Sequence, residues 1–247
     1  MLTLIYIIVA TLVISLSSLM GVITLSFKPV FLQRILLLLV SLSAGTMLGG
    51  AFIHLLPEAA EMLEINQTLT ITLLSFCFFF LVEKTLHWRH CHKQNCHIHE
   101  FGYLNLIGDS IHNFIDGLVI AGAFLVNPSL GITTSLAIIL HEIPQEIGDF
   151  GVLLHSGFSK RQAVLSNLGV AFTALMGGVL GYFLGSVMNG LQPILLCLAA
   201  GGFIYIATSD LIPEIRKEAS LKKWLTSYGM FILGLIIMWV SKIMGKV

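Results

Sequence analysis

The feature that most constrains this chain is a series of eight long apolar segments. They cover approximately residues 2–27, 31–56, 67–86, 103–126, 131–154, 163–188, 191–212 and 225–243. A helix rises about 1.5 Å per residue, so each segment is long enough to cross a hydrocarbon core about 30 Å thick. Only 11% of the 247 residues are charged, against about a quarter in a typical soluble domain. We therefore expect an all-α integral membrane protein of eight transmembrane helices, with residues 1–247 forming one domain.

The basic residues of the loops predict how the chain crosses the membrane. Loops on the cytoplasmic side of membrane proteins are enriched in Lys and Arg. Four alternate loops carry eleven of the thirteen basic residues, namely Lys28, Arg34, Lys84, Arg89, Lys93, Lys160, Arg161, Arg216, Lys217, Lys222 and Lys223. The opposite side has only Lys242 and Lys246, together with acidic residues near Glu61. Both termini are therefore predicted to lie outside the cytoplasm.

The same features bear on location and on some partners. Residues 1–27 lack a basic region and a small-residue cleavage site, which indicates a retained first span rather than a signal peptide. With no separate soluble domain, a prokaryotic plasma membrane is the expected location and an organelle membrane is the alternative. The formal net charge is zero, so nothing indicates a nucleic-acid partner. The lipid bilayer is the expected surrounding, and a homodimer is left open.

Two polar motifs interrupt the fourth and fifth apolar segments. The first is His112-Asn113-Phe114-Ile115-Asp116-Gly117 and the second is His141-Glu142-Ile143-Pro144-Gln145-Glu146. Residues four apart lie on one face of a helix, so His112 lies beside Asp116 and His141 beside Gln145. Only a short turn separates the two segments, which predicts that the helices are antiparallel neighbours.

These side chains fit a metal site better than a set of unrelated buried polar residues. Ionisable groups inside a membrane are costly and usually functional. One histidine could simply bond to a neighbouring helix, but two matched motifs need a common reason. Imidazole with carboxylate suits zinc and the neighbouring first-row ions. The candidate ligands are His112, Asn113, Asp116, His141, Glu142, Gln145 and Glu146.

Pro144 should kink the fifth helix. It cannot donate a hydrogen bond to the carbonyl of Leu140. A freed carbonyl is tolerated within a membrane only where another group satisfies it. We therefore expect a further donor or a polar cavity beside Leu140.

A weak internal repeat relates the second and seventh segments. Gly49-Gly50-Ala51-Phe52 precedes Leu55-Leu56-Pro57-Glu58, and Gly201-Gly202-Phe203 precedes Leu211-Ile212-Pro213-Glu214. The distribution of basic residues places the two ends on opposite faces of the membrane. Related segments that cross in opposite directions are typical of inverted-repeat transporters. Chance recurrence of Gly-Gly and Pro-Glu is the alternative.

Taken together, the two motifs resemble those of the ZIP (Zrt/Irt-like protein) metal transporters. His-Asn-x-x-Asp-Gly followed by His-Glu-x-Pro-x-Glu is similar to their fourth and fifth spans, and residues 141–146 read HEIPQE, near the subgroup with HEIPHE. The resemblance covers nearly the whole chain. It implies a 3+2+3 arrangement, in which the first three and last three helices form an inverted pair around helices four and five.

The resemblance also implies a binuclear or nearly binuclear metal site in the middle of the membrane. His112, Asp116, His141 and Gln145 would line the primary site, while Asn113 and Glu142 would share Asp116 in the adjacent one. Gln145 stands where His or Glu is usual, which predicts looser binding or another metal preference. Some members supply a carboxylate from the sixth span, but residues 167–178 contain none. Occupation of the adjacent site is therefore left open.

Further polar residues extend the motifs along the membrane. The candidate pathway residues are Met47, His54, Asp109, Asp149, His155 and Asp210, with Glu58 and Glu214 as weaker candidates. Packing is the favoured interpretation of Met47, and reaching toward water at a helix end is the alternative for those near the interfaces. A His/Cys-rich loop at about 87–100 contains His87, His90, Cys91, His92, Cys96, His97 and His99. We predict that this loop is a cytoplasmic metal acceptor or sensor, with a solvated loop of no role as the alternative.

The sequence favours transport of a divalent cation toward the cytoplasm, with no enzymatic activity. Zinc is the expected cargo rather than a cofactor, and Fe²⁺, Mn²⁺ and Cd²⁺ are alternatives. Uptake should depend on pH, because the ligands bind metal only when deprotonated. An intramembrane zinc metalloprotease is one alternative, since His141-Glu142 begins like His-Glu-x-x-His, but the fifth position is Gln145. A passive cation channel is the other.

Overall fold

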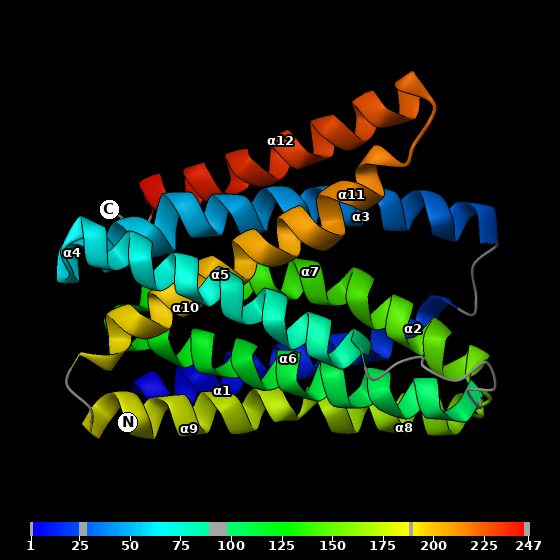
Figure 1. Ribbon diagram of the computed structural model, residues 1–247, viewed down its shortest axis with the longest axis horizontal. Coiled ribbons are helices and arrows are strands. Elements are labelled where there is room, and N and C mark those ends of the chain that lie inside the picture. Colours follow the sequence, from blue (N-terminus) through cyan, green and yellow to red (C-terminus); the bar gives the residue numbers. More distant parts are fainter. Residues whose placement is uncertain (1, 25–28, 89–97, 188–189, 245–247) are drawn as a thin grey trace.

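The protein is a bundle of long helices that run roughly along one axis (Figure 1). The computed structural model describes residues 2–24, 29–88, 98–187 and 190–244, and within these ranges the regular structure is entirely helical. In chain order the elements are α1 (Leu2–Ser15), η1 (Leu16–Leu19), α2 (Met20–Thr24), α3 (Pro29–Gly49), η2 (Gly50–Leu55), α4 (Leu56–Met62), α5 (Ile65–Trp88), α6 (Ile98–Val126), α7 (Pro128–His155), α8 (Lys160–Ala171), α9 (Thr173–Val187), α10 (Leu191–Ile206), η3 (Ala207–Leu211), α11 (Ile212–Arg216) and α12 (Leu221–Met244).

The predicted all-α membrane fold is confirmed. Within the described residues, seven helical segments are long and apolar enough to cross a membrane. The eighth predicted span is α7, which has 28 residues and would extend about 42 Å. It is missing from the seven because the polar residues of its motif lower its mean hydropathy. The start of α1 and the end of α12 lie at the same end of the bundle, as an even number of spans requires (Figure 1).

Several predicted boundaries are wrong by a few residues. The second apolar segment was expected to end at about residue 56, but the helix continues to Met62. Pro57 follows a stretch of π-helix, and the carbonyl of Ile53, four residues earlier, accepts a hydrogen bond from Lys242 instead. Residues 87–88 and 98–100, expected in the His/Cys-rich loop, belong to the ends of α5 and α6.

The second and seventh spans share an unusual local structure. In each, a long helix passes into a π-helical segment and then into a short helix with proline in its first turn, as α3–η2–α4 and α10–η3–α11. The two spans run in opposite directions (Figure 1). Their packing partners also correspond, since α3 packs on α12 and α10 packs on α5. Local geometry, direction and packing thus support the inverted repeat predicted from the Gly-Gly and Pro-Glu pairs.

Close helix contacts hold α6 in the middle of the bundle. It packs against α9, α7 and α10. At the α6–α9 contact, a Cβ on Gly117 would clash with the backbone carbonyl of Ala174, and a Cβ on Gly177 with that of Phe114. Small residues allow this approach, which is the usual basis of helix association in membranes. Because Gly117 follows Asp116 directly, the contact also fixes the position of a predicted ligand.

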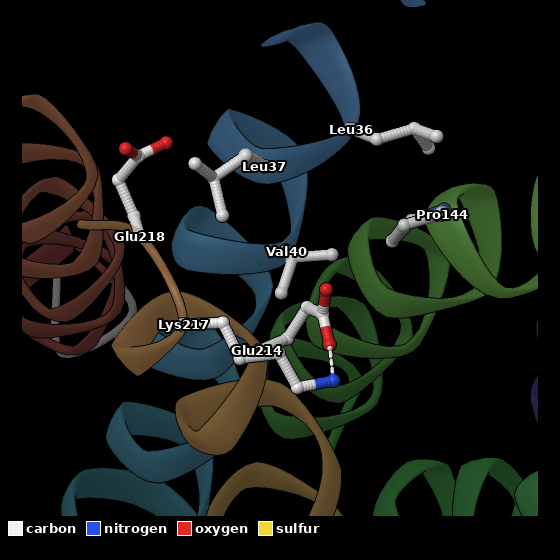
Figure 2. Close-up of a pocket in the computed structure, with 7 residues that line it drawn as sticks. All are labelled: Leu36, Leu37, Val40, Pro144, Glu214, Lys217 and Glu218. Carbon is white, nitrogen blue, oxygen red and sulfur yellow. Dashed lines mark hydrogen bonds and ion pairs between the residues drawn. The ribbon is translucent and has the colours of Figure 1, made fainter. Parts of the chain in front are cut away.

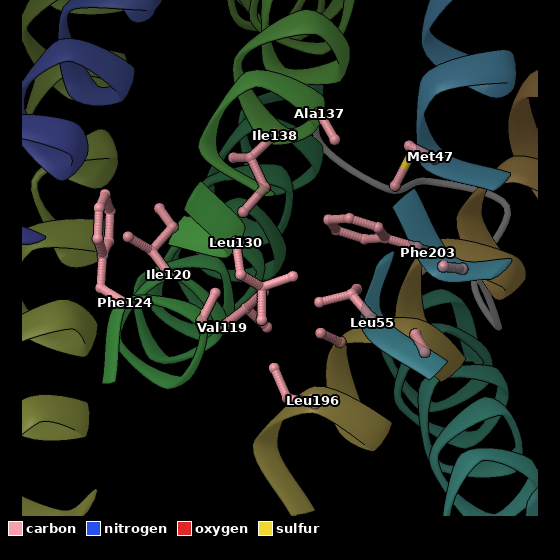
Figure 3. Close-up of a cluster of buried hydrophobic side chains, with 14 of the residues drawn as sticks. Met47, Leu55, Val119, Ile120, Phe124, Leu130, Ala137, Ile138, Leu196 and Phe203 are labelled. Atoms are coloured by element: carbon pink, nitrogen blue, oxygen red, sulfur yellow. The ribbon is translucent and has the colours of Figure 1, made fainter. Parts of the chain in front are cut away.

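A cluster of buried apolar side chains fills the bundle between α3, η2, α6, α7 and α10. We call it the apolar cluster, and its main members are Met47, Leu55, Val119, Ile120, Leu130, Ala137, Ile138, Leu196 and Phe203. Figure 3 shows Phe203 pointing toward α7, beside Ala137 and Met47. Each of these members is at most 4% exposed, so this part of the bundle is closely packed.

Candidate metal site

Four side chains from α6 and α7 converge next to the apolar cluster. They are His112, Asp116, His141 and Glu142, and each places a ligand atom within 4.8 Å of those of the other three. No other group of three or more His, Cys, Asp or Glu in the described ranges meets this condition. We call them the four-residue cluster.

The distances within the four-residue cluster are those of ligands that face a common point. His112 Nε2 lies 3.2 Å from His141 Nε2 and 3.2 Å from Glu142 Oε1. His141 Nε2 lies 3.4 Å from both Asp116 Oδ2 and Glu142 Oε1. The two imidazole rings are almost perpendicular, at 86°. All four donor atoms are therefore turned inward.

Hydrogen bonding leaves these atoms available for a ligand. Asp116 Oδ2 and both carboxylate oxygens of Glu142 are buried and have no hydrogen-bond donor. His141 Nδ1 lies 3.3 Å from the Ala137 carbonyl, which places the proton there and leaves Nε2 with its lone pair. Buried carboxylates that lack donors are costly. Two nitrogen and two carboxylate oxygen ligands are the donor set that zinc prefers, so a divalent cation would satisfy all four.

The carbonyl that Pro144 leaves free in α7 has a polar partner on a neighbouring helix, as the sequence predicted. Pro144 lies inside the helix. The carbonyl of Leu140, which Pro144 cannot bond, lies within hydrogen-bond distance of the Ser43 hydroxyl on α3, whose single proton is shared between this carbonyl and that of Leu39 in its own helix. One turn of α7 that carries two ligands is thereby tied to the neighbouring span. At its start, Asn127 caps α7 by accepting a bond of 2.8 Å from the backbone N–H of Leu130.

The arrangement of the remaining motif residues differs from the one implied by resemblance. Glu142 was assigned to the adjacent site, but its carboxylate lies within the four-residue cluster. Gln145 Nε2 instead donates to Asp109 Oδ1 at 3.2 Å, and Asn113 Nδ2 donates to the same oxygen at 2.9 Å. Through these two bonds Asp109 links α6 to α7 one turn away from the four-residue cluster.

Two residues in the surroundings of the site were not recognised in the sequence. Asn167 on α8 donates to Glu146 at 3.0 Å, and Asn105 on α6 donates to Asp149 at 2.9 Å. Asn167 was noted only as the start of a stretch without carboxylates. The signal that could have found both is an amide within an otherwise apolar span, since such groups need a polar partner.

Comparisons with known proteins agree with this geometry. A model of the ZIP zinc transporter family matches residues 1–100 and 89–242. The chain belongs to this family. It is similar to the zinc transporter YKE4 of Saccharomyces cerevisiae, with 30% identity over 239 residues that cover 81% of this chain and 69% of the relative.

Other ZIP relatives match a smaller share of their own length. The zinc transporter ZIP13 of Pongo abelii is 31% identical over 215 residues, covering 81% of this chain and 65% of the relative. The human zinc transporter SLC39A7 is 42% identical over 156 residues, covering 60% of this chain and 33% of the relative. The matched part thus spans from a third to about two thirds of these two proteins.

The four-residue cluster of this ZIP protein has one apolar and one polar neighbourhood. On the side where α6 ends and α7 begins lies the apolar cluster, and the Phe203 ring stands 6.1 Å from that of His141 between ring centroids. On the other side, Asp109 bonds to Gln145 and Asn105 bonds to Asp149, each pair joining α6 to α7. These two pairs follow the His112–His141 pair at intervals of about one helical turn.

The predicted pathway residues do not all lie with the cluster. Met47 is part of the apolar cluster, as its packing interpretation required. His54 Nε2 lies 2.8 Å from the carbonyl of Met238 and 3.1 Å from the hydroxyl of Ser241, so it is bound to α12. His155 is exposed at the end of α7, and Asp210 is exposed on η3.

The weaker candidates Glu58 and Glu214 have local partners. Glu58 accepts a bond of 3.3 Å from Asn127, and Glu214 forms an exposed ion pair with Lys217. Figure 2 shows this ion pair beside a pocket of about 440 Å³, which is lined by Val40 of α3 and Pro144 of α7. Glu214 thus fits the interpretation of an interfacial residue that reaches water.

Most of the predicted loop ligands lie in the part of the chain that the structure does not describe. His90, Cys91, His92, Cys96 and His97 lie outside the described residues, and His99 belongs to the first turn of α6. The metal-acceptor role of this loop therefore stays a prediction.

Proposed function

We propose that this ZIP protein carries zinc across the membrane toward the cytoplasm, and that the four-residue cluster is where the ion exchanges water for protein ligands. The observation that supports the proposal most is the convergence of two histidine Nε2 atoms and two carboxylates within 4.8 Å, between spans four and five. Three of the carboxylate oxygens have no other hydrogen-bond donor. Zinc binding would offset the cost of burying them.

The proposed direction rests on charge and polarity together. The polar neighbourhood leads from the cluster toward the end of α7, near His155, and α8 begins there with Lys160 and Arg161. Lys217 and Lys222 belong to another of the loops predicted to be cytoplasmic by their basic residues. In this arrangement both termini are extracytoplasmic and the protein lies in a plasma membrane. An ion at the cluster would face the cytoplasm through Asp109 and Asp149.

Transport also requires that the cluster become accessible from the other side. The apolar cluster closes that side, so we propose that α6 and α7 shift together against α3 and α11. The pocket bounded by Leu36, Val40 and Pro144 lies along that boundary, where it leaves room for a shift (Figure 2). Fe²⁺, Mn²⁺ and Cd²⁺ are proposed as further substrates, because ligand type alone does not separate first-row ions.

The test is zinc uptake into proteoliposomes that contain the purified chain. Each of His112→Ala and Glu142→Ala removes one of four converging ligands, and we expect uptake to fall to the level of empty liposomes. The matched control is Glu64→Ala, which removes an exposed carboxylate between α4 and α5 and should leave uptake unchanged. Normal uptake by both cluster variants, at equal amounts of inserted protein, would refute the proposed site.

A further inference from the structure

Three buried carboxylates outside the four-residue cluster share one arrangement. In each of them a side-chain amide donates to one oxygen, while the other oxygen is buried and has no hydrogen-bond donor. The pairs are Asn113 to Asp109 at 2.9 Å, Asn167 to Glu146 at 3.0 Å, and Asn105 to Asp149 at 2.9 Å. An amide that fixes one oxygen of a carboxylate also fixes the direction of the second, which is how protein groups orient metal ligands.

The amides contribute unpartnered oxygens of their own. Asn113 and Asn167 use their N–H groups on carboxylates, so Asn113 Oδ1 and Asn167 Oδ1 are left without donors. Both residues are 0% exposed, as is Glu146, and Asp109 is 6% exposed. Five oxygens, three of them from carboxylates, therefore lie in the interior without a hydrogen-bond donor. Such groups are rare in folded proteins because each costs about 1–3 kcal/mol.

These oxygens lie around one junction of three helices. Asp109 comes from α6, Glu146 and Asp149 come from α7, and Asn167 comes from α8, and these three helices contact one another. The charge of Asp149 acts on Asp109, and those of Asp109 and Asp149 act on Glu146. A cation between them would relieve the mutual repulsion and satisfy the free oxygens together.

The junction differs from the four-residue cluster in two ways. It offers only oxygen ligands, with no imidazole. Its carboxylates also do not converge within 4.8 Å, as those of the cluster do. Oxygen-only sites suit harder ions such as Mn²⁺, and a wider site leaves room for water in the coordination shell.

We propose that Asp109, Glu146 and Asp149 form a second divalent-cation site, all-oxygen and partly hydrated, between the four-residue cluster and the end of α7. We call it the oxygen site. Its use as the next station for a transported ion rests on the proposed function, whereas its ability to bind a cation does not. Zinc held there lacks the nitrogen ligands that zinc prefers, so the site passes the ion on rather than retaining it.

The experiment counts Mn²⁺ on the full chain in lipid nanodiscs by electron paramagnetic resonance. The wild type is expected to bind two ions. The double variant His112→Ala with His141→Ala removes both nitrogen ligands of the four-residue cluster, and it should keep one Mn²⁺ whose spectrum shows no coupling to nitrogen. Adding Asp149→Asn should weaken this remaining binding by at least about tenfold. Glu64→Gln, an exposed carboxylate elsewhere, is the control and should change nothing.

Two results would overturn the oxygen site. One is the absence of bound Mn²⁺ in the histidine double variant, and the other is a remaining ion that Asp149→Asn does not weaken. If the double variant does not fold, the count is made on the wild type and on Asp149→Asn alone. A fall from two ions to one supports the proposal, and an unchanged count refutes it. Zinc uptake by His112→Ala is measured separately, so the proposed function can hold while the oxygen site fails.

Discussion

The two neighbourhoods of the four-residue cluster lie on the same pair of helices and differ completely in chemistry. Toward the end of α6 and the start of α7, the packed residues are Val119, Ile120, Leu130 and Ile138. In the other direction, the same helices exchange hydrogen bonds between side chains, as in the Gln145–Asp109 pair. A cation at the proposed site would therefore meet further polar side chains on one side only.

This difference explains how one site can serve two faces of a membrane without forming a pore. Close packing of apolar side chains excludes water and ions, because a bare charge among them has no compensating partner. The polar neighbourhood offers such partners at each turn. The proposed shift of α6 and α7 against α3 and α11 would then expose the cluster to the other face, as alternating access requires.

The comparison is tested most strongly by placing the same carboxylate in both neighbourhoods. Ile138 and Gln145 lie two turns apart on α7, and Ile138 is 0% exposed within the apolar cluster. We expect Ile138→Glu to destabilise the protein by at least about 4 kcal/mol, because it buries a charge with no partner. In the presence of zinc, Gln145→Glu should lower stability by less than about 1 kcal/mol, since the bound ion stabilises the folded state. Thermal unfolding of both variants with saturating zinc provides the measurement.

Gln145→Glu also carries a second expectation. Without zinc, the Gln145→Glu variant should be less stable than the wild type. The new carboxylate cannot donate a hydrogen bond to Asp109, and it places a like charge beside it. Adding zinc should therefore raise the unfolding temperature of this variant more than that of the wild type. If Ile138→Glu and Gln145→Glu lowered the stability of the protein equally, both with and without zinc, the two neighbourhoods would not differ as described.

The second test removes bulk from the apolar neighbourhood. Phe203 is 2% exposed and packs beside His141, so Phe203→Ala should leave a cavity and cost about 3 kcal/mol of stability. The matched control is Phe52→Ala, because Phe52 is 58% exposed and should cost much less. Thermal unfolding in the same detergent compares the two, and a similar loss at both positions would argue against a packed seal at Phe203.

The smallest expected effect concerns the boundary between the neighbourhoods. The Ser43 hydroxyl reaches the Leu140 carbonyl that Pro144 leaves free, in addition to the Leu39 carbonyl of its own helix, so Ser43→Ala should cost about 1 kcal/mol. Ser41 is a matched control, because its hydroxyl donates only within its own helix, to the carbonyl of Leu37. A chemical denaturation series of both variants would separate them. No difference between Ser43→Ala and Ser41→Ala would mean that the freed carbonyl is satisfied in another way.

The sequence predicted the fold and the centre of the site more accurately than the arrangement around that centre. The motifs on α6 and α7 contain all four residues of the cluster, and three of them, His112, Asp116 and His141, are those that the resemblance assigned to one site. The partner of Gln145 did not follow, because helix periodicity places a side chain on a face but does not choose between two neighbours on that face. The role of Asn167 was likewise hidden, since nothing local indicates that α8 reaches Glu146.

By itself the sequence determined the helical spans and the polar face of each central helix, because length, apolarity and spacing along a helix are properties of the local chain. Tertiary structure decided the rest. Contacts such as Gly117 against the Ala174 carbonyl set the position of α6, and the Ser43 bond to Leu140 ties α7 to α3. Those contacts fix which side chains of the two helices meet. They place Glu142 with the histidines and leave Gln145 bonded to Asp109, because a shift of one turn between the helices would exchange these partners.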